Sequence, residues 1–179
     1  IDTATKAIIL SGSPFSVNDG LLPNVDLTAW RGKFPILGVC YGAQLMAHQN
    51  GGFVVPSKIR EYGRANLSFI ADDILFTGVS KDSQVWMSHG DTIQSIPENF
   101  SIIASTESVK VAAYKINGEP TYAIQFHPEV THSPEGALML ENFVKHVAKM
   151  SQDWTPVHFI ENITKELKEK IGNDKVILG

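Results

Sequence analysis

Cys40, the only cysteine of the 179-residue chain, lies between two glycines in the run G-V-C-Y-G of residues 38–42. This run has the form G-x-nucleophile-x-G, which is typical of a turn from strand to helix so sharp that the central side chain stands exposed. A thiol at the start of a helix is pushed towards the thiolate by the helix dipole and by unpaired backbone N–H groups. Taken alone, the same run also fits a cysteine that packs in the core as a small apolar side chain.

A histidine and a carboxylate stand two residues apart in Gln125–Glu129, which reads Q-F-H-P-E. Residues i and i+2 of an extended segment face the same way, so Glu129 can hold one ring nitrogen of His127 while the other faces a substrate. Pro128 favours an extended conformation at His127. A histidine oriented in this way is the base that an attacking cysteine needs, and later the acid that protonates the leaving amine.

Acyl chemistry also needs hydrogen-bond donors that point at the developing oxyanion. The backbone N–H of Tyr41, directly after the cysteine, is one such donor by position. Gly12 and Ser13, in the Ser-Gly-Ser-Pro run at the end of an apolar segment, offer a second. A plain turn is the alternative interpretation of that run.

Two short apolar segments, Lys6–Leu10 and Pro35–Val39, predict buried strands that end at these candidate groups. A helix is expected over Tyr41–Gln49, and Asn50–Gly52 supplies its stop. Shorter strand-like segments follow, and Asn117-Gly118 between the last two is a strong hairpin signal. These segments are Ala65–Ala71, Gln84–Ser88, Ser101–Ser105, Lys110–Ile116 and Thr121–Phe126.

Two further helices are expected in the C-terminal third of the chain. The first starts at Ser133-Pro-Glu, with the Ser133 hydroxyl as its cap. The second is amphipathic and follows a linker after Met150, where we place a domain boundary. The fold class is therefore α/β, an open and mostly parallel central sheet flanked by helices, with an added antiparallel region.

The composition is that of an ordinary globular protein, with 43% hydrophobic and 19% charged residues. A formal charge of −4 gives no basic footprint for nucleic acid or for an anionic membrane surface. No apolar run approaches the roughly 20 residues that span a bilayer, and one cysteine cannot form an internal disulfide. We therefore expect a cytoplasmic protein that acts on a small molecule.

The combination of G-V-C-Y-G-A-Q, W-M-S-H-G-D and H-P-E-V-T-H resembles the class I, triad-type glutamine amidotransferases, and within them the glutaminase domain of the GMP synthase group. The resemblance implies a flavodoxin-like fold and a catalytic triad of Cys40, His127 and Glu129. It also implies that glutamine is the substrate. The residues that would hold glutamine are Gln44, Ser88, Gly90 and Asp91.

The same resemblance implies a domain organisation and partners. Residues 1–150 would form the glutaminase domain without its first strand and helix, and 151–179 a linker and the start of an ATP pyrophosphatase (synthetase) domain. In such a protein ammonia passes to XMP to make GMP. ATP and Mg²⁺ belong to the synthetase domain, no cofactor to the present chain, and the full-length protein is expected to be a homodimer.

Three alternatives stay open beside this interpretation. The chain could serve another acceptor, as in anthranilate or CTP synthesis, or it could be a silent regulatory domain. The intact cysteine turn and the intact His-Pro-Glu sequence argue against a regulatory domain without catalytic activity. A metal site made from Cys40, His89, His127 and His132 matches none of the usual ligand spacings.

Overall fold

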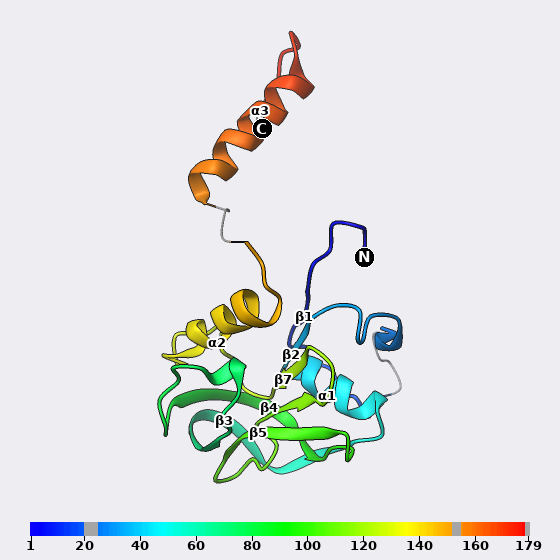
Figure 1. Cartoon of the computed structure of the whole chain (residues 1–179), viewed down its shortest axis with the longest axis vertical. Coiled ribbons are helices and arrows are strands. Elements are labelled where there is room, and N and C mark those ends of the chain that lie inside the picture. The colour runs from blue at the N-terminus through cyan, green and yellow to red at the C-terminus, as the bar shows by residue number, and fades with distance from the viewer. Residues whose placement is uncertain (20–24, 152–154, 178–179) are drawn as a thin grey trace.

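A single mixed sheet forms the body of the protein in the computed structural model (Figure 1). The structure describes residues 1–19, 25–151 and 155–177, with the backbone alone at 58–61 and 158. In spatial order its strands are β1 (Ile8–Leu10), β2 (Ile36–Val39), β7 (Thr121–Ile124), β6 (Ala113–Ile116), β5 (Phe100–Thr106), β3 (Phe53–Ile70) and β4 (Gln84–Ser95). The helices are α1 (Tyr41–Gln49), α2 (Gly136–Asn142) and α3 (Pro156–Ile171), with short 3-10 turns η1 (Leu27–Ala29) and η2 (Ile74–Phe76) and a π-helical turn η3 (Phe143–Val147).

The α/β class with an added antiparallel region is confirmed, but the proportions of the sheet differ from the prediction. Strands β1, β2 and β7 are parallel neighbours, and every other described pairing in the sheet is antiparallel. A short connection can only return the chain antiparallel, as at the β6–β7 hairpin, where Gly118 has φ 80°. The parallel part is thus confined to the strands that lead to the candidate site.

Strands β3 and β4 are much longer than the sequence pattern indicates. Their pairing is interrupted by register shifts between Phe53 and Val54 and between Pro56 and Glu61. A bulge breaks the period-2 alternation by which a strand is recognised, so only the regular part of each strand was predicted. The extension of β4 carries the Ser88–Asp91 segment to the end of the sheet.

Helices cover both faces of the parallel strands, and alternate strand residues point to opposite faces. On one face the strands pack against Met139 of α2 and Phe143 of η3. On the other face they pack against α1, which contributes Ala43 and Met46. The strand residues on the first face are Leu37, Val39, Tyr122 and Ile124, and those on the second are Ile36 and Ala123.

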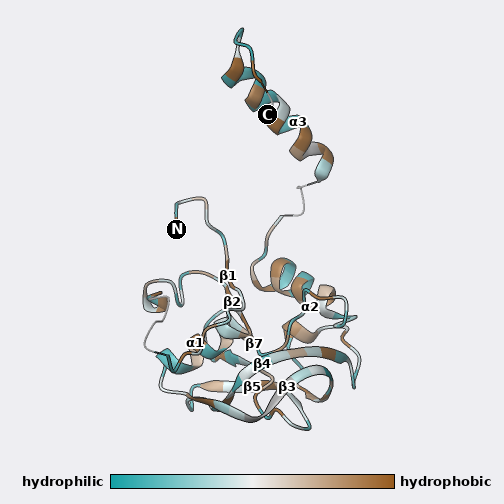
Figure 2. Cartoon of the chain, turned by 180° about the vertical axis from the view of Figure 1, so that it is seen from behind, coloured by the Kyte–Doolittle hydropathy of each residue, from teal (hydrophilic) through white to brown (hydrophobic). Residues whose placement is uncertain are grey.

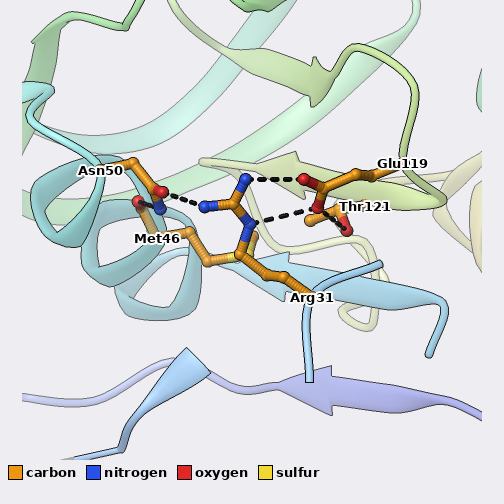
Figure 3. A network of polar contacts seen from close by, with 5 residues as sticks. All are labelled: Arg31, Met46, Asn50, Glu119 and Thr121. Carbon is orange, nitrogen blue, oxygen red and sulfur yellow. Dashed lines mark hydrogen bonds and ion pairs between the residues drawn. The ribbon is translucent and has the colours of Figure 1, made fainter. Parts of the chain in front are cut away.

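A polar network holds the C-terminal end of α1 (Figure 3). The Arg31 guanidinium donates two hydrogen bonds to the Glu119 carboxylate, at 2.7 and 3.1 Å, and a third to Asn50. Asn50 in turn donates to the Met46 carbonyl at 2.7 Å. The two parallel bonds from the guanidinium to the carboxylate form a geometrically specific ion pair. Because Glu119 lies in the β6–β7 hairpin and Asn50 follows α1, Arg31 links the end of α1 to that hairpin.

The start of α2 differs from the predicted cap. The helix begins at Gly136, after Glu135, whose side chain makes no capping bond. The hydroxyl of Ser133 instead donates to the carbonyl of His127 at 2.6 Å. The Ser133 oxygen, which a cap would offer to the helix as an acceptor, accepts from the Trp86 N–H at 3.0 Å instead, so the prediction of a serine cap is wrong.

Helix α3 exposes almost its whole surface, and its described side chains are exposed except for the half-buried Ile171. Figure 2 shows hydrophobic positions, in brown, spaced along this helix. Its apolar side chains Phe159, Ile160 and Leu167 are about half exposed or more. Part of the predicted linker before it, 152–154, lies outside the described residues. None of the helices described is long and apolar enough to cross a membrane.

Candidate active site

Cys40 sits at the junction of β2 and α1 in a conformation that side chains rarely adopt. Its φ is 52° and its ψ is −105°, a conformation that costs about 1–3 kcal/mol and persists only where the surrounding structure enforces it. The Cys40 N–H donates to the Ile124 carbonyl of β7 at 2.8 Å, and the Cys40 carbonyl accepts the first α1 bond from Gln44 at 3.1 Å. The strand-to-helix turn predicted from G-V-C-Y-G is thus present.

Gly42 makes this turn possible through close packing. A Cβ at Gly42 would overlap the backbone carbonyl of Leu10 in β1. The first turn of α1 therefore lies directly against the end of β1, where the Gly12 loop begins. This contact brings the cysteine turn and the predicted oxyanion loop together.

Gly42→Ala is expected to lower the free energy of unfolding by about 3 kcal/mol, because backbone must move to admit the methyl group. Gly90→Ala is the matched control, since a Cβ there meets no atom within 4 Å. Its effect should stay within about 0.5 kcal/mol. Urea unfolding of both variants checks this, and equal stabilities would contradict the packing argument.

His127 and Glu129 form the predicted pair. The distance between His127 Nδ1 and Glu129 Oε1 is 2.7 Å. A carboxylate accepts, so Nδ1 carries the proton and Nε2 is left to receive one. The Glu129 side chain is 51% exposed and that of His127 17%, so the carboxylate holds the ring from the solvent side.

Gly12 brings the histidine and the cysteine into one neighbourhood. A Cβ at Gly12 would lie 3.2 Å from His127 Cε1 and 3.8 Å from Cys40 Cβ. The three segments that the sequence singled out, Gly12–Ser13, Cys40 and His127–Glu129, therefore meet at the C-terminal ends of β1, β2 and β7. Ligands of open α/β sheets bind at this edge.

A cavity of about 470 Å³ opens over this meeting point. Most predicted site residues line it, namely Gly12, Ser13, Cys40, Gln44, Ser88, Gly90, Asp91 and His127. Tyr41 and Glu129 are not in the lining: Tyr41 is buried, and Glu129 contacts His127 from outside the cavity lining. Pro14, Phe15, Ser16, Tyr62 and His89 also line the cavity and were not among the predicted contacts.

The thiol of Cys40 is held as a neutral donor. Burial raises its pKa to about 11, against the lowering effect of the Tyr41 backbone N–H, and the negative charge of Glu129 raises it further. The thiol donates to the Ser88 carbonyl, with 3.7 Å between Sγ and oxygen. The expectation that the helix start pushes the group towards thiolate is wrong for this protein, because the cost of burying the charge outweighs the lowering effect of the Tyr41 N–H.

Residues 1–147 match the family model for class I glutamine amidotransferases. The chain belongs to this family. It is 60% identical to a GMP synthase (glutamine-hydrolysing) of Cytophaga hutchinsonii and 58% identical to one of Bacteroides fragilis, over 100% and 99% of its length. In both cases the chain spans only 35% of the relative.

Solved structures agree with the family. A protein of Thermoplasma acidophilum that is described as a GMP synthase subunit superposes with a TM-score of 0.61 at 32% identity, covering 74% of this chain and 61% of that one. A glutamine amidotransferase from Methylobacillus flagellatus gives 0.58 at 26% identity, covering 78% and 56%. The α/β fold of the chain is thus that of class I amidotransferases.

In this amidotransferase Gln44 is part of a buried amide pair. Its Nε2 donates to the Asp91 carbonyl at 2.8 Å and to Gln125 Oε1 at 3.2 Å. Both hydrogens of the Gln44 amide are used, so its oxygen is the atom left for a ligand. The part played by Gln125 was not predicted, because its sequence position reads only as strand core.

Asp91 joins the cavity wall to the loop after β1. Its carboxylate accepts a hydrogen bond from Ser16, and its carbonyl lies 2.8 Å from His89 Nδ1. A carbonyl cannot donate, so His89 Nδ1 is protonated. In the amidotransferase the Ser88–Asp91 segment is thus held from outside by Ser16 and by Gln44, and the His89 contact lies within the segment.

The described residues contain no group of three His, Cys, Asp or Glu side chains that could hold a metal ion. Within that part of the chain, His132 packs its ring against Trp86 at 4.4 Å between centroids. The cavity of the amidotransferase offers instead a thiol, an imidazole and backbone groups, the set that acyl transfer uses.

Proposed function

We propose that this chain hydrolyses the side-chain amide of glutamine through a thioester on Cys40. One observation supports this above all: Gly12, Cys40 and the His127–Glu129 pair meet beside one cavity, with Cys40 in a strained turn at the start of α1. Glutamine is the donor that the names of the relatives state.

The first half of the reaction would form the thioester. His127 Nε2 takes the proton of the Cys40 thiol as sulfur attacks the amide carbon. Backbone N–H groups at Tyr41 and at Gly12 or Ser13 would stabilise the oxyanion. The tetrahedral species then collapses, its C–N bond breaks, and His127 gives the proton to the leaving ammonia.

The second half would return the enzyme to its starting state. His127, now neutral, takes a proton from water as the hydroxide attacks the thioester carbon. The C–S bond breaks, glutamate leaves, and sulfur regains a proton. Glu129 would orient the imidazole and stabilise its charged form in both halves.

The relatives support a proposal for the acceptor of the ammonia. They are GMP synthases about three times as long as this chain. We infer that ammonia aminates XMP to GMP, and that ATP and Mg²⁺ act in the part of such a protein that lies beyond this chain. Residues 151–179 would begin that part, and the exposed apolar residues of α3 suit a helix that packs against it.

The test is an assay of the polypeptide as its organism makes it, with glutamine, ATP and XMP. Glutamate and GMP should form together, and asparagine should be hydrolysed at least about 100-fold more slowly, because a shorter side chain cannot place its amide at Cys40 while its α-groups stay bound. Chromatography of both products measures the outcome.

Two controls separate the donor from the acceptor. Omitting XMP tests the acceptor, and replacing it with chorismate or UTP tests the alternatives. Glutamate release without GMP would refute the acceptor alone. No glutamate release under any of these conditions would refute the glutaminase proposal.

A further inference from the structure

A single buried hydroxyl connects the proposed base to strand β4. Ser133, 4% exposed, donates to the His127 carbonyl at 2.6 Å and accepts from the Trp86 N–H at 3.0 Å. The His127 N–H donates to the Trp86 carbonyl at 2.9 Å. The three bonds close a ring that satisfies both backbone polar groups of His127 and of Trp86.

Strand β4, which carries Trp86, also contacts Cys40, the proposed nucleophile. β4 is the last strand of the described sheet, and residues i and i+2 of a strand direct their carbonyls to the same edge. The Trp86 carbonyl meets His127, and the Ser88 carbonyl lies 3.7 Å from Cys40 Sγ. The open edge of β4 therefore positions base and thiol with respect to each other.

We propose that Ser133 is a positioning residue for His127, because its hydroxyl bridges the His127 carbonyl to the Trp86 amide and so fixes the base against the strand that contacts Cys40. This inference rests on the proposed function, in which His127 carries the proton. Ser133 does not line the cavity, so it acts through the base and not on glutamine.

The backbone groups of the loop around Ser133 are engaged elsewhere and cannot replace its hydroxyl as the partner of Trp86 and His127. The Ser133 N–H donates to Val130 at 3.0 Å, and the Ser133 carbonyl accepts from Gly136 at 2.9 Å. A Cβ at Gly136 would overlap the Pro128 carbonyl, so backbone fills the space beside the loop. Without the hydroxyl, the Trp86 N–H and the His127 carbonyl would both lose a buried partner, and His127 would shift to recover one.

The test measures glutamate release by the naturally expressed polypeptide and its Ser133 variants. Ser133→Ala should lower kcat about 10- to 100-fold with the KM for glutamine within threefold, because a small misplacement of a base slows chemistry without removing substrate contacts. Ser133→Thr keeps the hydroxyl and should stay within threefold of wild type in both constants.

His132→Ala is the matched control for the loop. It removes the ring contact with Trp86 but leaves all three bonds of the ring in place, so kcat should stay within threefold. If Ser133→Ala does not fold, Ser133→Val is compared with Ser133→Thr instead. The two side chains have nearly the same shape, but only Thr carries the hydroxyl, so only Ser133→Val should show a lowered kcat.

Several results would overturn the proposal. One is a kcat in Ser133→Ala or Ser133→Val that equals that of the wild type. Another is a loss of kcat that is as large in Ser133→Thr as in Ser133→Val, or as large in His132→Ala as in Ser133→Ala. A third is an effect of Ser133→Ala on KM in place of kcat. The wild-type protein is assayed first, because its own release of glutamate tests the proposed function separately. An active wild type with an unaffected Ser133→Ala refutes only the positioning role.

Discussion

Cys40→Ala is expected to lower the rate of glutamine hydrolysis by about 10⁴-fold or more, down to the background of the assay. The loss is this large because the covalent route disappears, and the remaining His127 and backbone donors act as parts of one unit that no longer functions. Glutamine binding should persist, since the cavity keeps its other lining residues. Coupled detection of glutamate measures the rate, and equilibrium binding measures the affinity.

Cys40→Ser is the control that keeps both the shape of the side chain and the strained backbone at φ 52°. A hydroxyl is a much weaker acid than a thiol, so this variant should be nearly as inactive as Cys40→Ala. Unfolding curves should show both variants folded. Release of glutamate by either one at more than a tenth of the wild-type rate would exclude the thioester mechanism.

That the residues of the proposed triad come together could be predicted, because the signals are local. The two glycines around Cys40 and the two-residue spacing of His127 and Glu129 each describe geometry within a few residues. The structure places Glu129 Oε1 at 2.7 Å from His127 Nδ1. Both His127 and Cys40 lie next to Gly12. Strand β2 and helix α1 were predicted for the same reason, since a turn signal bounds each.

The connections between distant segments could not be predicted. Ser133 read as a helix cap, and only the approach of β4 shows that Trp86 and His127 share its hydroxyl. Gln125 read as strand core, and its amide pair with Gln44 spans 81 residues. Bonds of this kind depend on tertiary packing, for which a single sequence carries no local pattern.

The charge state of the nucleophile depends on packing in the same way. The position of Cys40 at the start of α1 predicted a lowered thiol pKa, whereas burial raises that pKa to about 11. At pH 7 the thiolate fraction is then about 10⁻⁴, which follows from a gap of about four pH units. In the proposed mechanism His127 would therefore have to remove the thiol proton during the attack.

His127→Gln should consequently lower kcat/KM about 10³-fold at pH 7 and change the shape of its pH dependence. With no base, the rate follows the thiolate fraction. The thiol loses its proton as pH rises, so the residual rate should climb about tenfold per pH unit from pH 7 to 10 and level off above the pKa of about 11. A pH series of initial rates measures this slope.

Glu129→Ala provides the contrast, because it removes the orienting carboxylate and keeps the imidazole. Its loss should be smaller, about 10- to 100-fold, since water can replace the carboxylate at a position that is already half exposed. Removal of the negative charge also lowers the pKa of Cys40. A flat pH profile in His127→Gln, or a larger loss in Glu129→Ala than in His127→Gln, would show that His127 is not the group that takes the thiol proton.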